Sequence, residues 1–391
     1  MRDLLQCRDD IDRIDSQILK LLQERMDVAT DIASYKLAHN QSITDSVREH
    51  SKLQTLRNKA KELGLPPSYI SDVYKLIIRH TCSVEQEYIV AKANESSIDR
   101  DTSVAYLGTK GSYSHVATCR YFEGFKGKID AHGCGSFSEI AGLVETGKCE
   151  FGVLPIENSS SGSINDVLDV KQTTKASIVG EIFVPIDHAV LGVENIDLSK
   201  ITDLYSHPQP VTQCSHWIKD LLPNVNIHYT KATTEAMEIV SKLKDPAHVA
   251  IGSHMAASFY NLVPIFDNIA NNIHNFTRFI VISMTPITVP QSISAKTSIS
   301  FSVQKYQPGS LISVLSEFSK RNINMTKLIS RPKIEYSRET WEEIFFTDLE
   351  GNIDAPVMQD ILEEIKPFTN SLKVLGCYPN SELKSDFTAS L

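Results

Sequence analysis

An uninterrupted helical pattern at the start of the chain limits its possible folds more than any other feature. Between Leu4 and Ala38, apolar residues recur at steps of three and four without a proline or a glycine. This spacing predicts one amphipathic helix, about three times as long as the mean globular helix. Most of its apolar stripe needs a surface to cover it, and a helix of a partner chain is the expected cover. The stripe consists of Ile11, Ile14, Ile18, Leu21, Val28, Ile32 and Tyr35.

Two basic residues lie on the inner side of this predicted helix. Arg25 occupies a position where the repeat places an apolar residue, and Lys36 returns to within about 20° of the same face. A cation on a buried face is costly unless an anion meets it, so the pair marks a candidate anion-binding groove. The alternative is that both side chains reach solvent or pair with Glu24, Asp27 or Asp31.

Shorter helices follow the first. One is expected from Thr44-Asp45 to Gly64, where glycine signals a helix end. Pro66-Pro67-Ser68 opens the next, in which apolar residues again have helical spacing up to Glu85. Between Lys92 and Thr102 the periodicity is lost and the sequence becomes polar. We therefore predict an all-helical domain over residues 1–92 and a linker over 93–102.

Short apolar runs alternate with helical patterns between residues 103 and 285. Such alternation predicts parallel sheets, whose ligands lie beyond the carboxyl ends of the strands. The expected strands are Val104–Leu107, Phe151–Leu154, Ile178–Phe183, Ala189–Val193, Asp203–Ser206, Val249–Ile251 and Arg278–Ser283.

The stretch from Phe151 to Asp166 has the features of a site. A buried strand leads directly into eight consecutive positions dominated by glycine and hydrogen-bonding side chains. Ser163, Asn165 and Asp166 are helix-capping residue types, so a helix is expected to begin here. Free N–H groups at a helix start favour an anion. The plain alternative is an ordinary loop between a strand and a helix.

Composition and charge exclude several classes of protein. The formal net charge of −9 argues against nucleic-acid binding, although local cations can still hold small anions. The seven cysteines contain no CxxC pair, which predicts neither a disulfide framework nor a zinc cluster. Such cysteine use is typical of the reducing cytoplasm. No apolar run reaches the ~18 residues of a membrane span, and no apolar leader is present, so a soluble, untargeted protein is expected.

Four motifs appear in the order found in one enzyme family. They are Gly108-Thr109-Lys110-Gly111-Ser112-Tyr113-Ser114, Pro155-Ile156-Glu157-Asn158-Ser159, Ser206-His207-Pro208-Gln209 and Asn275-Phe276-Thr277-Arg278-Phe279. With its flanking modules, the chain resembles the bifunctional chorismate mutase–prephenate dehydratases of phenylalanine biosynthesis. The resemblance implies a helical mutase domain, a dehydratase of two α/β lobes over residues 103–285, and a regulatory domain over 296–382.

The resemblance implies that chorismate binds in an intertwined helical dimer, where each site takes one cation from the partner. The cations would hold the carboxylates and the ether oxygen, and a D-x-x-R-E pattern would orient the hydroxyl. The rearrangement needs a compact substrate conformer and donors at the ether oxygen, not a nucleophile. Arg25, Lys36 and Glu85 are the expected catalytic residues. The full set is Arg8 of the partner subunit, Arg25, Lys36, Asp45, Arg48, Glu49, Thr81 and Glu85.

Glu85 departs from the pattern commonest in this bacterial family, which has glutamine there. A carboxylate would repel an oxygen that gains negative charge, so Glu85 must be protonated to donate a hydrogen bond. Burial favours the neutral form of a carboxyl group. We therefore predict that mutase activity falls as pH rises through the neutral range, and that Glu85→Gln widens the active range.

The resemblance also implies a prephenate site. The reaction expels carbon dioxide and a hydroxyl together, so it needs a donor at the departing hydroxyl and contacts for two carboxylates. Thr277 is the expected donor, acting as a positioned hydroxyl rather than a free acid. Arg278 beside it is expected to be either a carboxylate-binding or a structural cation. The other expected contacts are Asn158, Ser159, Ser160, Ser161 and Gln213.

Three other motif residues leave alternatives open. Glu157 either caps a helix or touches substrate. His207, before Pro208, is more consistent with a turn than with a catalytic acid, although it could line the same cleft. The loop from Gly108 to Ser114 lacks the spacing of a nucleotide-binding motif, and its helix start would suit a substrate carboxylate equally well.

The C-terminal region follows a composition break at Pro286–Ala295. The expected elements are strand Thr297–Val303, helix Gly309–Lys320, strands Met325–Ser330 and Trp341–Asp348, helix Met358–Thr369 and strand Leu372–Tyr378. This βαββαβ order fits a ferredoxin-like split βαβ layout. It resembles an ACT domain, which implies phenylalanine as an effector, bound by Gly309, Ser310, Leu311, Ser330, Arg331 and Pro332.

Two departures from the effector motifs predict weak or absent feedback. The family usually has alanine where this chain has Ser310, and glutamate where it has Ile329. Losing that acid removes a charge or hydrogen bond that helps to fix the loop. The alternative is that other contacts hold the loop and sensing survives.

The sequence therefore predicts a cytoplasmic bifunctional enzyme that is a homodimer or a larger homo-oligomer. It is expected to use no metal and no organic cofactor, and to bind neither nucleic acid nor membrane. Two alternatives are a monofunctional dehydratase with a degenerate mutase domain, and a ligand-binding regulator without catalysis. The retained Arg8, Arg25, Lys36, Arg48 and Glu49 argue against the first, and Thr277 with these cations argues against the second.

Overall fold

A computed structural model describes residues 3–43, 45–95, 100–272, 274–303, 308–334 and 342–381. The described residues pack as two compact units, one from residues 1–97 and 287–296 and the other from 98–286 and 297–381. Thr44, Trp341 and part of the predicted linker lie outside the described residues. No helix in the described ranges is long and apolar enough to cross a membrane.

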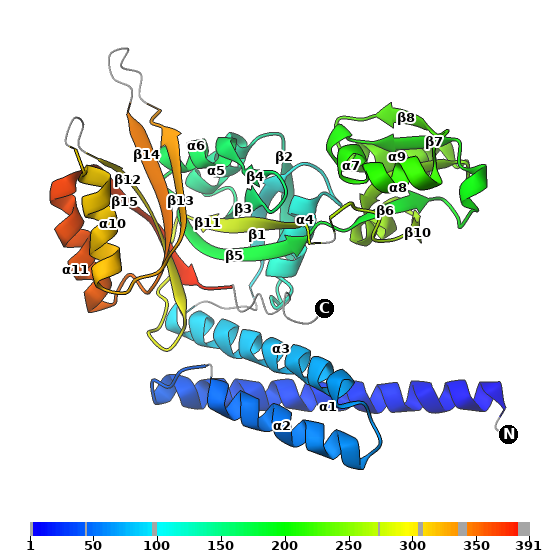
Figure 1. The fold of residues 1–391 in the computed structure, drawn as a ribbon, viewed down its shortest axis with the longest axis horizontal. Coiled ribbons are helices and arrows are strands. Elements are labelled where there is room, and N and C mark those ends of the chain that lie inside the picture. The colour runs from blue at the N-terminus through cyan, green and yellow to red at the C-terminus, as the bar shows by residue number, and fades with distance from the viewer. Residues whose placement is uncertain are drawn as a thin grey trace. The chain divides into compact units, whose positions relative to one another are not determined.

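The first unit contains helices α1 (Leu4–Ala38), α2 (Ser46–Glu62) and α3 (Pro67–Ala93), close to the predicted bounds. The Asp45 carboxylate caps α2 by accepting a hydrogen bond from the Arg48 N–H at 2.9 Å. Gly64 follows α2 at φ 71°, a conformation that glycine adopts at little cost. Helix α3 packs against both α1 and α2 (Figure 1).

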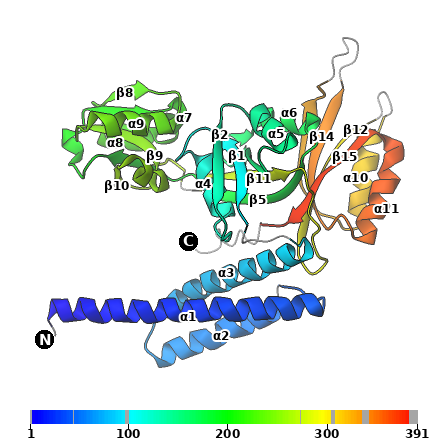
Figure 2. The ribbon, with the colours of Figure 1, turned by 180° about the vertical axis from the view of Figure 1, so that it is seen from behind.

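The apolar stripe of α1 is largely uncovered within one chain. Ala29 and Ala33 are buried, whereas Leu21 and Val28 are 64% and 54% exposed. The N-terminal part of α1 extends beyond α3 (Figure 2). A further surface is therefore still needed to cover this stripe, as the sequence predicted. The exposed apolar side chains of α1 are Leu4, Leu5, Ile11, Ile14, Ile18, Leu19, Leu21, Val28 and Tyr35.

A segment from the middle of the chain also belongs to the helical unit. Asn94, just after α3, donates to the Thr288 carbonyl at 2.8 Å and accepts from the Thr288 N–H at 2.7 Å. The predicted break at Pro286–Ala295 thus packs with the first helices rather than forming a simple spacer.

The second unit begins with a mixed sheet of strand order β2-β1-β3-β11-β5, with β4 paired to β3. Its strands are β1 (Thr102–Leu107), β2 (Ile129–Cys134), β3 (Phe151–Asn158), β4 (Gly162–Ser163), β5 (Ser177–Pro185) and β11 (Phe276–Ser283). Helices α4 (Tyr113–Tyr121), α5 (Phe137–Glu145) and α6 (Asn165–Thr173) connect them. The predicted parallel order holds for β1, β2 and β3, but β11 returns antiparallel to both neighbours.

A second α/β lobe is inserted between β5 and β11. Its strand order is β10-β6-β9-β7-β8, and β6 and β10 run antiparallel to their neighbours. Its strands are β6 (His188–Gly192), β7 (Asp203–Ser206), β8 (Asn226–Tyr229), β9 (His248–Ser253) and β10 (Val263–Phe266). The helices are α7 (Pro208–Gln213), α8 (Ser215–Leu221) and α9 (Thr233–Leu243). The sequence did not predict three strands: β8 is mostly exposed, β2 mixes exposed and partly buried residues, and β10 is only four residues long and contains Pro264.

The remaining part of this unit is an antiparallel sheet of order β13-β14-β12-β15. Its strands are β12 (Ala295–Val303), β13 (Met325–Pro332), β14 (Glu343–Glu350) and β15 (Thr369–Pro379), with helices α10 (Ser310–Lys320) and α11 (Pro356–Ile365). The predicted βαββαβ order is confirmed. Phe301, Phe318 and Ile361 lie in the core under the helices, which cover one face of the sheet (Figure 1).

The other face of this C-terminal sheet lies against the first lobe. A Cβ atom on Gly376 of β15 would be 2.1 Å from the Ile178 carbonyl of β5, so the two backbones approach at a distance that only glycine permits. The C-terminal sheet and the sheet of the first lobe therefore share a packed interface within one unit.

Candidate active sites

The first polar cluster lies between α1 and α3. The Lys36 ammonium donates to the Glu85 carboxylate at 2.7 Å and to the Ile43 carbonyl at 2.8 Å. The Arg25 Nε donates to the Thr81 hydroxyl at 3.2 Å. Glu85 is 4% exposed and Thr81 8%. The structure thus brings together Arg25, Lys36, Thr81 and Glu85, which the sequence predicted to share one site.

The Lys36–Glu85 ion pair changes the electrostatics that the sequence predicted. The sequence predicted that burial favours a protonated Glu85, whereas the structure places the Lys36 ammonium 2.7 Å from its carboxylate. An anionic ligand at Lys36 would have to take the place of this carboxylate, or the carboxyl group would have to accept a proton. The structure therefore adds an internal competitor for Lys36.

The other predicted residues of this site lie at its rim or beyond it. Asp45, Arg48 and Glu49 form the first turn of α2, where Arg48 is exposed and Asp45 serves as the cap. Arg8 is exposed near the start of α1. At about 1.5 Å per helical residue, it lies roughly 40 Å along the axis from Lys36. Arg8 therefore cannot reach this cluster from its own chain.

Three of the four motifs meet at one edge of the first lobe's sheet. The carboxyl ends of the parallel strands β1, β2 and β3 lie at this edge, and β11 begins there because it runs antiparallel to β3. This edge therefore brings together the glycine-rich motif after Leu107, the motif that contains Asn158 and the motif that contains Thr277. The motif residues therefore lie at strand ends, where the sequence predicted a site.

Asn158 holds the hydroxyl of Thr277 in place. Its carbonyl oxygen accepts from the N–H groups of Ser160 and Ser161 at 2.9 and 3.0 Å. Because these backbone groups can only donate, the Asn158 amino group must point the other way, and it donates to the Thr277 oxygen at 2.9 Å. The hydroxyl proton of Thr277 is thus directed away from Asn158. Thr277 is 8% exposed, at the sheet edge.

The amide of Asn158 is fully engaged, since it also donates to the Asn275 side chain at 2.8 Å. We therefore correct its predicted role from a substrate contact to a positioning residue. Ser159 is likewise bound to β11: its N–H donates to the Phe276 carbonyl at 2.8 Å, and its hydroxyl accepts from the Phe276 N–H at 2.9 Å. Ser160 and Ser161 remain exposed at the rim.

Helix α6 starts at Asn165, as predicted, but its cap is different. Ile164 occupies the cap position, and no side chain makes a capping hydrogen bond there. The predicted capping roles of Ser163, Asn165 and Asp166 are wrong, because the short strand β4 fixes the chain before the helix instead.

Arg278 points to the opposite face of the sheet from Thr277. Its guanidinium donates to Glu181 at 2.7 Å, to Asp348 at 2.5 Å and to the Tyr378 hydroxyl at 3.0 Å, and it is 5% exposed. Burial alone would lower the pKa of Arg278, but Tyr378 and the two carboxylates raise it well above its usual value. Of the two predicted roles, the carboxylate-binding one is therefore wrong, and Arg278 is a structural cation.

Glu157 also points away from Thr277. Its carboxylate lies 2.5 Å from the Lys327 ammonium of β13. Both alternatives from the sequence, a helix cap and a substrate contact, are therefore wrong. The partner comes from the C-terminal sheet, and nothing in the local sequence indicates it.

The facing edge of the second lobe carries Gln213, at the end of α7. Its carbonyl oxygen lies 2.7 Å from Nε2 of His188, and Nδ1 of His188 lies 3.2 Å from the Tyr113 hydroxyl of the first lobe. Burial lowers the pKa of His188, so the ring is neutral and donates from Nε2 to Gln213. The sequence analysis included Tyr113 in the glycine-rich motif without assigning it a role, and it did not identify His188.

The His207 motif and the glycine-rich loop make structural contacts. The His207 ring caps α7 by accepting from the Gln209 N–H at 3.2 Å, which agrees with the turn role. In the glycine-rich loop, the Thr109 hydroxyl donates to Thr234 at 2.9 Å and the Lys110 carbonyl accepts from Tyr260 at 2.5 Å. This loop therefore joins the two lobes.

The predicted effector residues lie on two elements of the C-terminal module. Gly309 caps α10 at φ 85°, Ser310 is buried, and Leu311 packs into the core below. On β13, Ser330 is exposed, whereas Arg331 donates to both oxygens of Asp169 in α6 at 2.9 and 2.7 Å. The Pro332 carbonyl accepts from Gln172 at 3.1 Å.

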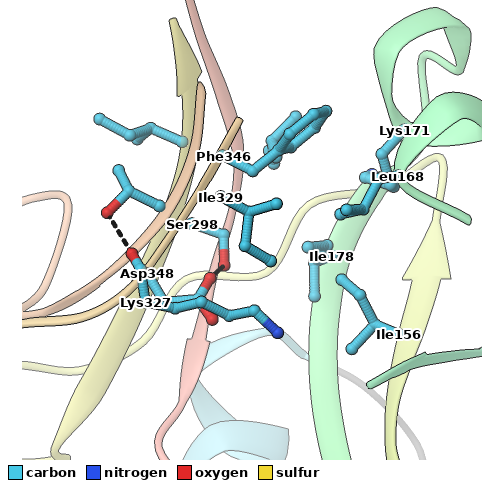
Figure 3. Close-up of a pocket in the computed structure, with 12 residues that line it drawn as sticks. Ile156, Leu168, Lys171, Ile178, Ser298, Lys327, Ile329, Phe346 and Asp348 are labelled. Atoms are coloured by element: carbon cyan, nitrogen blue, oxygen red, sulfur yellow. Dashed lines mark hydrogen bonds between the residues drawn. The ribbon is translucent and has the colours of Figure 1, made fainter. Parts of the chain in front are cut away.

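A small pocket lies between the C-terminal sheet and the first lobe (Figure 3). Ile156, Leu168 and Ile178 line one side, and Ile329 and Phe346 line the other. Lys171 is fully buried beside it and donates to the Ala176 carbonyl at 2.8 Å. Burial, with a smaller effect from Lys373, lowers the pKa of Lys171 to about 7.

This buried amine should weaken the fold at neutral and acidic pH. A base whose pKa is lowered by folding destabilises the folded state most below that pKa, and the cost disappears as pH approaches the ordinary value of 10.5. Lys171→Met should therefore raise the free energy of unfolding at pH 6.5, measured by urea titration, by roughly 1–3 kcal/mol. This range allows for the hydrogen bond that the substitution removes. The gain should vanish near pH 10. Exposed Lys175→Met is the control, and an equal gain at both pH values would contradict the prediction.

Comparison with known proteins identifies the two units. Residues 7–86 match the chorismate mutase type II family, and residues 104–286 match the prephenate dehydratase family. Proteins described as bifunctional chorismate mutase/prephenate dehydratase are similar over nearly the whole chain. The Enterobacter agglomerans protein is 40% identical and that of Escherichia coli K12 is 37% identical, each over 97% of both chains. The Aquifex aeolicus protein is 34% identical over 98% of this chain and all of its own.

Solved structures resemble the second unit. The quorum quenching acylase GqqA is 28% identical, with a TM-score of 0.64 over 72% of this chain and 99% of its own. The prephenate dehydratase of Arthrobacter aurescens, solved with L-Phe, is 24% identical, with a TM-score of 0.62 over 71% of this chain and 90% of its own, and shows the shared fold. By its sequence, and by both matched families, the chain belongs to the bifunctional chorismate mutase/prephenate dehydratases.

Proposed function

We propose that the helical unit rearranges chorismate to prephenate, and that the second unit dehydrates and decarboxylates prephenate to phenylpyruvate. The observation that carries this proposal is the presence of two separate polar clusters, one in each unit. Lys36, Glu85, Arg25 and Thr81 form the first, and Asn158 with Thr277 forms the centre of the second. A degenerate mutase domain is not favoured, because the first cluster is intact.

In the mutase site, Arg25 and Lys36 are proposed to hold a carboxylate and the ether oxygen of chorismate. The reaction breaks and forms bonds within one bound molecule, so positioning and charge stabilisation supply the catalysis. Lys36 must exchange the Glu85 carboxylate for the ether oxygen, or Glu85 must be protonated. Thr81, Asp45, Arg48 and Glu49 are proposed to complete the contacts.

Arg8 is proposed to act in the site of a second copy. The uncovered apolar stripe of α1 supports a homodimer, in which the exposed Leu21 and Val28 become buried. The distance of Arg8 from Lys36 supports the exchange of this cation between chains. A cytoplasmic location is part of the proposal.

Glu85→Gln should increase mutase kcat/KM at pH 8 by about 10-fold, because it removes the ion pair that competes for Lys36 and supplies a permanent donor. The difference between the two proteins should be smaller at pH 5 than at pH 8. Chorismate consumption measured from pH 5 to 8 tests this. A flat profile for the unmodified protein, or a loss of activity in the variant at pH 8, would contradict the prediction.

In the dehydratase site, the Thr277 hydroxyl is proposed to donate to the departing hydroxyl of prephenate. The bond to the ring carboxylate breaks, its electrons complete the aromatic ring, and the C–O bond breaks as hydroxide takes up a proton. The products are carbon dioxide, water and phenylpyruvate. Exposed Ser160 and Ser161, with Gln213 on the facing lobe, are proposed to contact the substrate.

The C-terminal module is proposed to be an ACT domain that binds phenylalanine through Gly309, Ser310, Leu311, Ser330, Arg331 and Pro332. Its split βαβ order supports this, as does the L-Phe complex of the Arthrobacter aurescens enzyme. Inhibition should be weak or absent, because Ile329 faces the apolar pocket and Asp169 already holds Arg331.

One coupled assay of the purified full chain tests these assignments. Chorismate loss and phenylpyruvate appearance should both be observed, and adding phenylalanine should change neither rate at micromolar concentration. Absence of both reactions would overturn the proposed function. Inhibition at micromolar phenylalanine would overturn only the expectation of weak feedback.

A further inference from the structure

The two residues nearest the proposed dehydratase donor alternate between the faces of the sheet. In the register of β11 against β3, Thr277 lies opposite Asn158, and Arg278 lies opposite Glu157. Paired residues share a face and successive residues alternate, so the first pair faces the site and the second faces the C-terminal sheet. Immediately beyond, the register shifts at a β-bulge in which Ile156 is the extra residue.

The C-terminal sheet holds the second pair through side chains from three strands. Lys327 of β13 lies 2.5 Å from Glu157, while Asp348 of β14 and Tyr378 of β15 bind Arg278. These side chains are mostly buried; Lys327 and Asp348 are 14% and 11% exposed. Removing a partner of Arg278 or of Lys327 leaves a buried cation uncompensated, whereas Glu157 is the more exposed member of its pair, at 38%.

Strand β13, which carries Lys327, and the residues just after it also contact helix α6, which follows the Ser-rich segment after Asn158. Arg331 binds Asp169 of α6, and the N–H of Ile334 donates to Gln172 at 2.8 Å. Contacts from β13 and the residues after it therefore lie on both sides of the Ser-rich turn, at Glu157 before the turn and at helix α6 after it. Figure 3 shows Lys327 extending its amino group from the C-terminal sheet toward the strand that carries Ile156.

We propose that Lys327 and Glu157 are positioning residues for the dehydratase reaction, through which the C-terminal sheet sets the position of Asn158 and Thr277. This inference rests on the proposed role of Thr277 as donor. The turn holds the Asn158 side chain through its hydrogen bonds. The ion pair with Lys327 holds Glu157, the residue next to Asn158 in the strand. A displacement of β13 therefore moves the donor without any contact between the C-terminal sheet and substrate.

Lys327→Met and Glu157→Gln should each lower dehydratase kcat by roughly 10- to 100-fold, as expected for a small misplacement of a catalytic group, with KM changed less than about 2-fold. The double variant should be no worse than either single variant, because both remove the same contact. Lys327→Arg, which keeps the cation, should recover most of kcat.

Lys373→Met is the matched control. Lys373 also reaches from the C-terminal sheet to the first lobe, where it donates to the carbonyls of Thr174 at 2.6 Å and Lys171 at 3.5 Å rather than to Glu157. Its loss should leave dehydratase kcat within about 2-fold, because it does not contact the pair that positions Thr277. Mutase activity and circular dichroism of each variant check folding.

The outcomes separate this inference from the proposed function. Should Lys327→Met fail to fold, the nearly isosteric Glu157→Gln decides alone. Normal kcat in Glu157→Gln, or equal losses in Lys327→Met and Lys373→Met, would overturn the positioning role while leaving the dehydratase assignment intact. A full chain without dehydratase activity would instead overturn the proposed function itself.

Discussion

Thr277→Val is expected to lower dehydratase kcat by about 10²- to 10³-fold, the usual effect of removing one preorganised donor from an active site. Valine has the shape of threonine, so the sheet edge should be kept, but the departing hydroxyl loses its hydrogen bond. The Asn158 amino group also loses an acceptor, although Asn275 still accepts from it at 2.8 Å. KM should change little, because the interaction is proposed to matter most in the transition state.

Two further variants make this experiment specific. Thr277→Ser keeps the hydroxyl and should retain most of the activity. Thr118→Val removes a buried hydroxyl of the same lobe, one that donates to the Ser114 carbonyl within α4, and should leave kcat nearly unchanged. Dehydratase activity in Thr277→Val within about 3-fold of the unmodified chain would exclude Thr277 as the donor.

Lys36→Met is expected to lower mutase kcat/KM by about 10³-fold or more, with the dehydratase reaction unaffected. The substitution removes the cation proposed for the ether oxygen, and it also leaves the Glu85 carboxylate buried without its ammonium partner. That carboxylate would then repel the charge developing on the substrate. The variant therefore loses a favourable interaction and gains an unfavourable one.

The double variant Lys36→Met/Glu85→Gln separates these two effects. It has no uncompensated charge, so it should recover part of the lost mutase activity relative to Lys36→Met alone. Exposed Lys61→Met on α2 is the control for loss of a positive charge. A Lys36→Met protein with mutase activity near normal would show that the cluster between α1 and α3 is not the site.

Much of the fold could be predicted because its signals are local. The periodic stretch of α1, the glycine after α2 and the prolines before α3 each indicate a helix boundary within a few residues. The strands that the sequence predicted are mostly buried runs, whereas β8 is largely exposed, β2 mixes exposed and partly buried residues, and β10 is only four residues long. The antiparallel return of β11 depends on where the chain re-enters the first lobe, which no local pattern records.

The site was predicted less completely, because neighbouring residues on a strand have opposite roles. Asn158 and Thr277 were recognised from motifs, but Glu157 and Arg278 belong to the same motifs and face away. Their partners Lys327 and Asp348 come from a later part of the chain, so only the assembled sheets reveal them. His188 gave no signal, since a single buried histidine is ordinary in a core, and Tyr113 was recognised only as a member of the first motif.

The hydrogen bonds between Asn94 and Thr288 have a consequence for how such an enzyme can be shortened. After the helical unit the chain forms the two α/β lobes. Residues 287–296 then pack with the helical unit again, at the end of α3, before the C-terminal sheet begins. Truncation before residue 287 would remove, together with the C-terminal sheet, a segment that packs with the helical unit. A shortened mutase would therefore lose both hydrogen bonds of the Asn94 side chain to Thr288, and the end of α3 would need another contact in their place.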